Sequence, residues 1–73
     1  MNIEELENST KGSVISCLSM INRLCKMKSE LEEEYTNDSR KYAFEENRRQ
    51  TLLHNFMLTL ERQYEFLKKL EQF

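Results

Sequence analysis

The chain has almost no residues that interrupt a helix. It contains no proline and one glycine, Gly12, in 73 residues. Proline and glycine are the strongest helix-breaking residues, so helices here are expected to end only where short polar residues cluster. Two such clusters exist, at residues 8–12 and at residues 36–39. The chain is therefore expected to form long helices with two weak breaks.

Between the two clusters, apolar residues follow the three-and-four spacing of an amphipathic helix. Lys28 is the one interruption of this stripe, and the spacing predicts a helix over residues 13–36. The residues of the stripe are Val14, Cys17, Ile21, Leu24, Leu31 and Tyr35.

Beyond the second cluster the same spacing predicts a longer helix over residues 39–73. Its stripe is interrupted by Glu46, Arg49 and Gln63. In the cluster between the helices, Asn37 is expected to take the left-handed conformation that ends the first helix, and Asp38 or Ser39 is expected to cap the second. The apolar residues of the second stripe are Tyr42, Leu53, Phe56, Leu60, Leu67 and Leu70.

The two stripes are out of phase by four residues, so one straight helix would carry its apolar seam round to another face. A hairpin removes this conflict. We therefore predict an all-α fold with a single domain, residues 1–73, arranged as an antiparallel, coiled-coil-like two-helix hairpin. The rival arrangement is one long helix with a stutter that dimerises along its length. Residues 1–12 would form either a short N-terminal helix that packs through Ile3 and Leu6 or a frayed end.

Both stripes are wider than the seam of a hairpin. Leu18, Met20, Cys25 and Met27 flank the first stripe, and Leu52, Met57, Tyr64, Phe66 and Phe73 flank the second, while Phe44 and Leu58 point nearly opposite it. Soluble monomers rarely expose so much contiguous apolar surface. The pattern predicts that another protein, or a second copy in a four-helix bundle, covers these residues.

Charges of opposite sign stand on the two sides of the expected turn. The acidic residues Glu30, Glu32, Glu33 and Glu34 precede it, and the basic residues Arg40, Lys41, Arg48 and Arg49 follow it. In an antiparallel hairpin the two groups would face each other. They form either an ordinary solvated surface, in which each pair contributes under about 1 kcal/mol, or contacts that set the register of the helices.

No arrangement of residues typical of catalysis is visible. His54 is the only histidine and falls outside the seam, and Cys17, Cys25 and His54 could bind a metal only if the hairpin register brought them together. We therefore predict no enzyme activity, no cofactor and no metal. The net charge of −2 gives no reason to expect nucleic-acid binding.

The sequence also predicts a cytoplasmic location. No apolar run exceeds three residues, against the roughly 20 that span a bilayer, so no membrane insertion is expected. Glu4 and Glu5 stand where a secretory signal carries basic residues. Cys17 and Cys25 are eight residues apart, about 12 Å along one helix, and so cannot form a disulfide bond with each other.

The chain has a short polar N-terminal stretch and a first helix that ends in lysine and glutamate. An acidic turn residue is followed by a tyrosine at the start of the second helix, here Asp38 and Tyr42. In these respects and in its length, the chain resembles the small helical-hairpin co-chaperones of bacterial type III secretion systems. The second helix departs from the family pattern in being longer and more aromatic.

The resemblance implies a cytoplasmic co-chaperone that pairs with a helical-repeat chaperone subunit and keeps a needle subunit soluble. Under this hypothesis, heptad positions assign partner binding to Met20, Met27, Leu52, Leu58, Phe66 and Phe73. A different class of function is also compatible with the pattern, namely a small structural subunit of a coiled-coil scaffold or a self-associating helical bundle.

Overall fold

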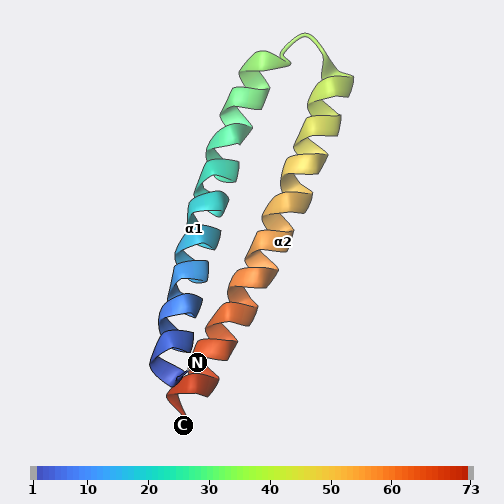
Figure 1. Cartoon of the computed structure of the whole chain (residues 1–73). Coiled ribbons are helices and arrows are strands. Elements are labelled where there is room, and N and C mark those ends of the chain that lie inside the picture. The colour runs from blue at the N-terminus through green and yellow to red at the C-terminus, as the bar shows by residue number, and fades with distance from the viewer. Residues whose placement is uncertain (1, 73) are drawn as a thin grey trace.

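The structure is a computed structural model that describes residues 2–72, and it is a two-helix hairpin (Figure 1). Helix α1 spans Ile3–Glu34 and helix α2 spans Ser39–Glu71. The two helices pack antiparallel, and the described residues contain no strand. The predicted all-α, antiparallel hairpin is thus confirmed.

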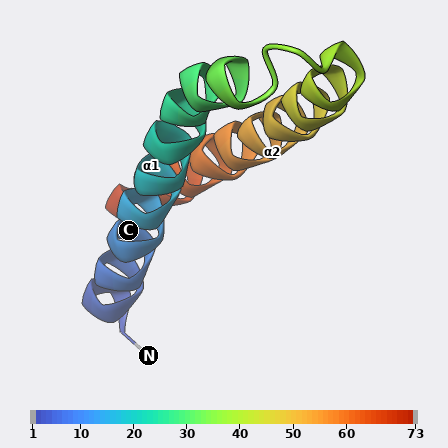
Figure 2. The same ribbon diagram turned by 90° about the horizontal axis from the view of Figure 1, so that it is seen from above.

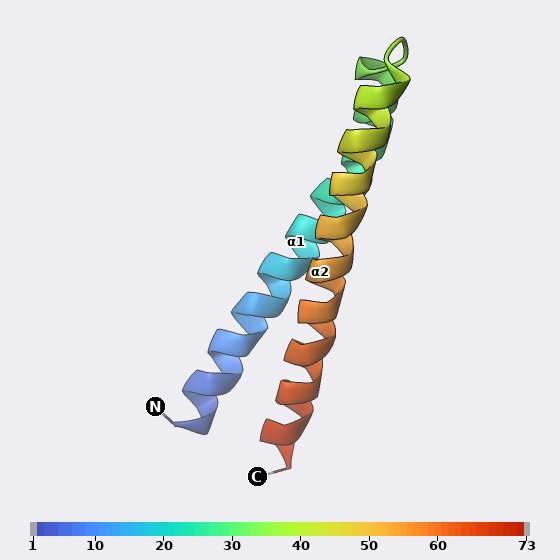
Figure 3. The ribbon, with the colours of Figure 1, turned by 90° about the vertical axis from the view of Figure 1, so that its right-hand side faces the viewer.

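The hairpin is a thin rod. It measures 55 × 15 × 14 Å and has a radius of gyration of 16.6 Å, against about 11 Å for a compact domain of this length. In Figure 1 the helices lie side by side at the turn and overlap at the open end. In Figure 3 they overlap at the turn and lie side by side at the open end. Seen from above in Figure 2, their axes diverge. The helices therefore cross at an angle, as expected for coiled-coil-like packing.

The predicted break at residues 8–12 and the predicted helix start at residue 13 are wrong. Helix α1 begins at Ile3 and runs through Gly12 without interruption. The side chain of Asn2 caps this helix by accepting a hydrogen bond from the backbone N–H of Glu5 at 2.8 Å. One helical glycine costs only about 1 kcal/mol. Residues 3–12 are therefore the first turns of α1 rather than a separate short helix or a frayed end.

Thr10 explains why the helix continues through the expected break. Its side chain is buried against α2 and lies in line with the seam, four residues before Val14. The Thr10 hydroxyl donates a hydrogen bond to the Leu6 carbonyl at 2.7 Å, which satisfies this buried polar group within its own helix. The seam of α1 thus extends about one turn further toward the N-terminus than the apolar residues alone indicate.

The turn between the helices is short and closed by side chains. The hydroxyl of Thr36 donates to the carbonyl of Glu32 at 2.7 Å, which satisfies one carbonyl left free at the end of α1. Asp38 caps α2 by accepting a hydrogen bond from the Lys41 N–H at 3.1 Å, as predicted. The left-handed conformation expected of Asn37 is absent, since no described residue, glycine included, has a positive φ.

The core follows the predicted seams. Val14, Cys17, Leu24 and Leu31 of α1 are buried, and Leu70 of α2 is buried with them. The remaining apolar seam residues are half-buried, and none of the described side chains is fully sealed from solvent. Two packed helices share only one contact surface, so the core is a single layer of side chains. No helix within residues 2–72 is long and apolar enough to cross a membrane.

Candidate functional site: a buried arginine and two apolar flanks

A buried arginine joins the two helices. Arg49 of α2 is only 7% exposed, although the sequence marks it as an interruption of the seam. Its Nη1 donates to the Leu24 carbonyl of α1 at 3.1 Å. Its Nε and Nη2 donate to the two carboxylate oxygens of Glu46 at 2.9 and 2.6 Å. All three donor nitrogens of the guanidinium therefore have partners, which is the condition under which a charge tolerates burial.

The bond from Arg49 to Leu24 sets the antiparallel register. Because both helices rise about 1.5 Å per residue, residues equally far from this bond in opposite directions lie level with each other. Thr10 of α1 is then level with Gln63 of α2, which is another polar position of the second stripe. A shift of register would bury Arg49 without its carbonyl partner, a loss that costs more than the hydrogen bond itself provides. Arg49 thus joins the helices through a backbone carbonyl and not through the acidic run that the sequence places opposite it.

The cross-helix contacts expected of the acidic run do not form. Within residues 2–72 the one salt bridge joins Arg49 to Glu46 of its own helix. Glu30, Glu32, Glu33 and Glu34 are exposed on α1, and Arg40, Lys41 and Arg48 are exposed on α2. These side chains belong to the solvated surface. Only one of the four basic residues turns inward.

The ion pair changes the acidity of Glu46. Hydrogen bonds from Arg49, and to a smaller extent from Gln50, lower the pKa of the Glu46 carboxyl from 4.5 to about 2, against the opposing effect of burial. The same carboxylate raises the pKa of Arg49. Both shifts favour the charged forms. Since the folded pKa of Glu46 lies below its ordinary value, folding is favoured more strongly when this carboxyl is ionised.

We expect the stability of the hairpin to fall in acid through Glu46. The contribution of this pair is fully present above about pH 5 and is lost as the pH falls toward 2, and it amounts to roughly 1–3 kcal/mol. Urea unfolding at a series of pH values measures it. The matched control is Glu46→Gln, which keeps the shape but cannot titrate. If the difference between wild type and Glu46→Gln does not change with pH, the ion pair makes no contribution.

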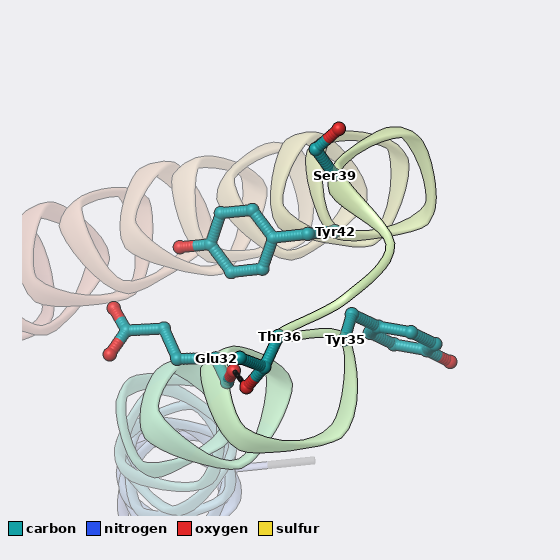
Figure 4. A pocket seen from close by; sticks show the side chains of 5 residues that line it. All are labelled: Glu32, Tyr35, Thr36, Ser39 and Tyr42. Carbon is teal, nitrogen blue, oxygen red and sulfur yellow. Dashed lines mark hydrogen bonds between the residues drawn. The ribbon is translucent and has the colours of Figure 1, made fainter.

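A shallow hollow lies at the turn (Figure 4). The ring of Tyr42 projects from α2 into the space above Glu32 of α1, whereas Tyr35 points away from it. Burial, followed by the charges of Glu46 and Glu32, raises the pKa of Tyr42. The charge of Glu34 is the main cause of the raised pKa of Tyr35. Both phenols are therefore neutral at physiological pH.

Exposed apolar side chains form a flank on one side of the seam. In heptad terms, these residues directly precede a core position on either helix, and in an antiparallel pair such positions lie on the same side. We call this surface the Leu52 flank; it consists of Met20, Met27, Leu52 and Phe66. The first three line one hollow of about 330 Å³ together with Leu24 and the charged residues Glu45, Arg48 and Arg49. This side of the hairpin is thus apolar, concave and edged with charge.

A second flank lies on the other side of the seam. Its residues directly follow a core position on either helix. We call it the Leu18 flank; it consists of Ile15, Leu18, Cys25, Met57 and Tyr64. All five are exposed, and Ile15 is 68% exposed. The hairpin therefore presents apolar side chains on both sides rather than on one.

The residues predicted to bind a partner occupy more than one face. Met20, Met27, Leu52 and Phe66 share the Leu52 flank, with Met20 half-buried and the other three exposed. Leu58 is exposed on the outer face of α2. Phe73 lies outside the described residues. The sequence-based assignment placed these side chains on flanks without separating the two sides, although heptad position gives the side of each residue once the helices are known to be antiparallel.

The two cysteines and the histidine do not come together. Cys17 is buried in the seam, and Cys25 is exposed. Residues 2–72 contain no group of three histidine, cysteine, aspartate or glutamate side chains placed to hold a metal ion. The structure thus offers surfaces for contact rather than a polar cluster. Comparison of the chain with protein families, with curated proteins and with solved structures found no match.

Proposed function

We propose that this chain is a non-enzymatic protein-interaction module that binds another helical protein through the Leu52 flank. The supporting observation is the ratio of exposed to buried apolar side chains. Among residues 2–72, ten large apolar side chains are exposed, whereas only five apolar residues are buried. Seven further apolar residues of the seam are half-buried, so the exposed large apolar side chains nearly equal the core in number, which is rare for a free monomer.

The extent of the surface supports the same proposal. The chain exposes 5960 Å², whereas a compact monomer of 8.9 kDa exposes about 4,800 Å². The excess of roughly 1,100 Å² exceeds the 800 Å² or so that one partner contributes to a standard interface. Burying apolar area contributes about 25 cal/mol per Å². Burial of this excess surface by a partner would therefore contribute a good part of the stability of the assembled protein.

The finer proposal follows the resemblance to type III secretion co-chaperones. In that role the chain would act in the cytoplasm with a helical-repeat chaperone, and the pair would keep a polymer-forming needle subunit soluble. The hairpin architecture, the acidic turn residue Asp38 and the tyrosine at position 42 support it. The hollow of the Leu52 flank would receive a side chain of the partner, and its charged edge would orient the partner.

A structural subunit of a coiled-coil scaffold is the second candidate. The observation that favours it is the regularity of α2, where core positions recur at spacings of four and three without a break from Tyr42 to Leu70. A scaffold subunit would be permanently assembled with long coiled-coil proteins. A gene position beside secretion genes would favour the co-chaperone over the scaffold subunit.

Co-purification of the tagged chain from its native host separates these functions. Mass spectrometry would identify whatever elutes in stoichiometric amount. The co-chaperone proposal expects a helical-repeat protein together with a small polymer-forming subunit. Long coiled-coil proteins would instead support the scaffold, and an eluate that holds only the chain itself would contradict both.

Charges introduced at Leu52 and Phe66 should abolish the complex. We expect the double variant Leu52→Glu/Phe66→Glu to lose its partner, because the partner would have to bury unpaired carboxylates. Circular dichroism should show unchanged helix content, because neither side chain is buried in the free hairpin. The control is Phe44→Glu, which alters an exposed aromatic residue outside the proposed surface. Retained binding by the double variant would remove the claim.

A further inference from the structure

The Leu18 flank differs from the Leu52 flank in its charge. On the Leu18 side, the surface positions are those that directly follow a core position. Ten of them fall within residues 15–29 and 43–57, and none of the ten is Asp, Glu, Lys or Arg. Over the same length the Leu52 side carries Arg23, Glu45 and Arg48. One third of the whole chain is charged. An uncharged strip of this size on a hairpin surface therefore needs a cause of its own.

The register of the hairpin makes the strip continuous. The Arg49–Leu24 hydrogen bond places residues 15–29 of α1 level with residues 43–57 of α2. The strip thus runs for about 21 Å along both helices. Leu18 and Met57 lie within two residues of the same level, and they are 45% and 49% exposed. They stand close to the midpoints of α1 and α2, so the most apolar part of the strip is at the middle of the rod.

A surface with these properties suits a twofold axis. In a symmetric dimer the same patch faces itself, so a charged side chain near the axis would meet its own copy and be repelled. A different protein as partner imposes no such condition, because its charges can be complementary, as the mixed charges on the Leu52 side allow. The central position of the patch also lets two rods overlap along most of their length when they lie antiparallel.

The strip would form the centre of such an interface. It is about 21 Å long on a rod 15 Å wide, an area of roughly 300 Å², and residues beyond its ends would supply the rest of the 800 Å² or so that each partner contributes to a standard interface. The exposed side chains of Ile15, Leu18 and Met57 would supply its apolar centre.

We propose that a second copy of this chain packs on the Leu18 flank, with the twofold axis close to Leu18 and Met57. Two hairpins then form an antiparallel four-helix bundle. The Leu52 flank stays on the outside of this bundle and remains open to a different protein. The two flanks therefore have separate occupants, which makes the proposal independent of the function proposed above.

Light scattering on the purified full-length chain tests the proposal. The expected mass is twice the 8.9 kDa of one chain. Leu18→Glu should raise the dissociation constant of the dimer by roughly 100-fold or more, because each dimer would bury two unpaired carboxylates near the axis. The matched control is Leu52→Glu, at a side chain of similar exposure on the other flank, and it should stay dimeric. A monomeric wild type, or dissociation by Leu52→Glu alone, would overturn the proposal.

Cross-linking provides a test that does not depend on disrupting the dimer. Cys25→Ser first removes the exposed thiol and leaves only the buried Cys17. In that background Leu18→Cys should oxidise to a covalent dimer, because residues near a twofold axis approach their own copies. Leu52→Cys serves as the control and should remain uncross-linked under the same conditions. Equal cross-linking at both positions, or cross-linking at position 52 alone, would contradict the assignment of the second copy to the Leu18 flank.

Discussion

Arg49→Leu should lower the free energy of unfolding by roughly 1–3 kcal/mol, although it places an apolar residue at a seam position. The substitution removes the hydrogen bond to the Leu24 carbonyl and leaves the Glu46 carboxylate half-buried without its partner. Breaking one side of a buried ion pair usually costs more than the pair contributes, because the remaining charge stays poorly solvated. Urea unfolding at pH 7 and constant protein concentration measures the loss.

The double variant Glu46→Leu/Arg49→Leu separates the ion pair from the packing. It completes the apolar heptad of α2, so its stability should equal or exceed that of the wild type. The loss seen in the single variant would then come from the stranded carboxylate rather than from the missing arginine. A single variant as stable as the wild type would show that Arg49 contributes nothing to the hairpin, and the account of the register would be wrong.

Leu24→Ala should have the largest effect of any single apolar truncation. Leu24 is 4% exposed, the lowest value in the core, and its backbone carbonyl receives the Arg49 hydrogen bond. Truncating a buried leucine typically costs about 2–5 kcal/mol. A hairpin of this size has only a few kcal/mol in total, so much of the variant should be unfolded at 37 °C. Thermal unfolding followed by circular dichroism is the measurement.

Met27→Ala is the matched control for Leu24→Ala. Met27 lies in the next turn of α1 and is exposed on the Leu52 flank, so its truncation should change the free energy of unfolding by less than about 1 kcal/mol. Equal losses for the two variants would mean that burial in the seam does not determine the stability of the free hairpin.

The hairpin was predictable because its determinants are local. The three-and-four spacing of residues such as Cys17, Leu31 and Leu60, together with a capping aspartate at position 38, indicates two helices and a turn without knowledge of any contact. The start of α1 was missed because Ser9, Thr10 and Gly12 read as a break. Asn2 followed by Glu5 is the spacing of a capping residue, and this signal was present in the sequence.

Arg49 could not be placed from the sequence. Its burial depends on a backbone carbonyl of the other helix, and nothing in the sequence marks a carbonyl as available to a side chain. The surplus of apolar residues was predictable, and its division into two flanks follows from heptad position once the helices are antiparallel. The hydrogen bond from Arg49 adds which residues of α1 lie level with Met57 or Leu52.

Native mass spectrometry of the chain, released from its host under non-denaturing conditions, tests the central claim that other protein surfaces cover the flanks. The account predicts that the chain occurs in a particle heavier than 8.9 kDa and that it binds a different protein in fixed stoichiometry. That protein should be lost from the variant Leu52→Glu/Phe66→Glu. A wild-type chain recovered as a free monomer, or a partner that this variant retains, would contradict the account.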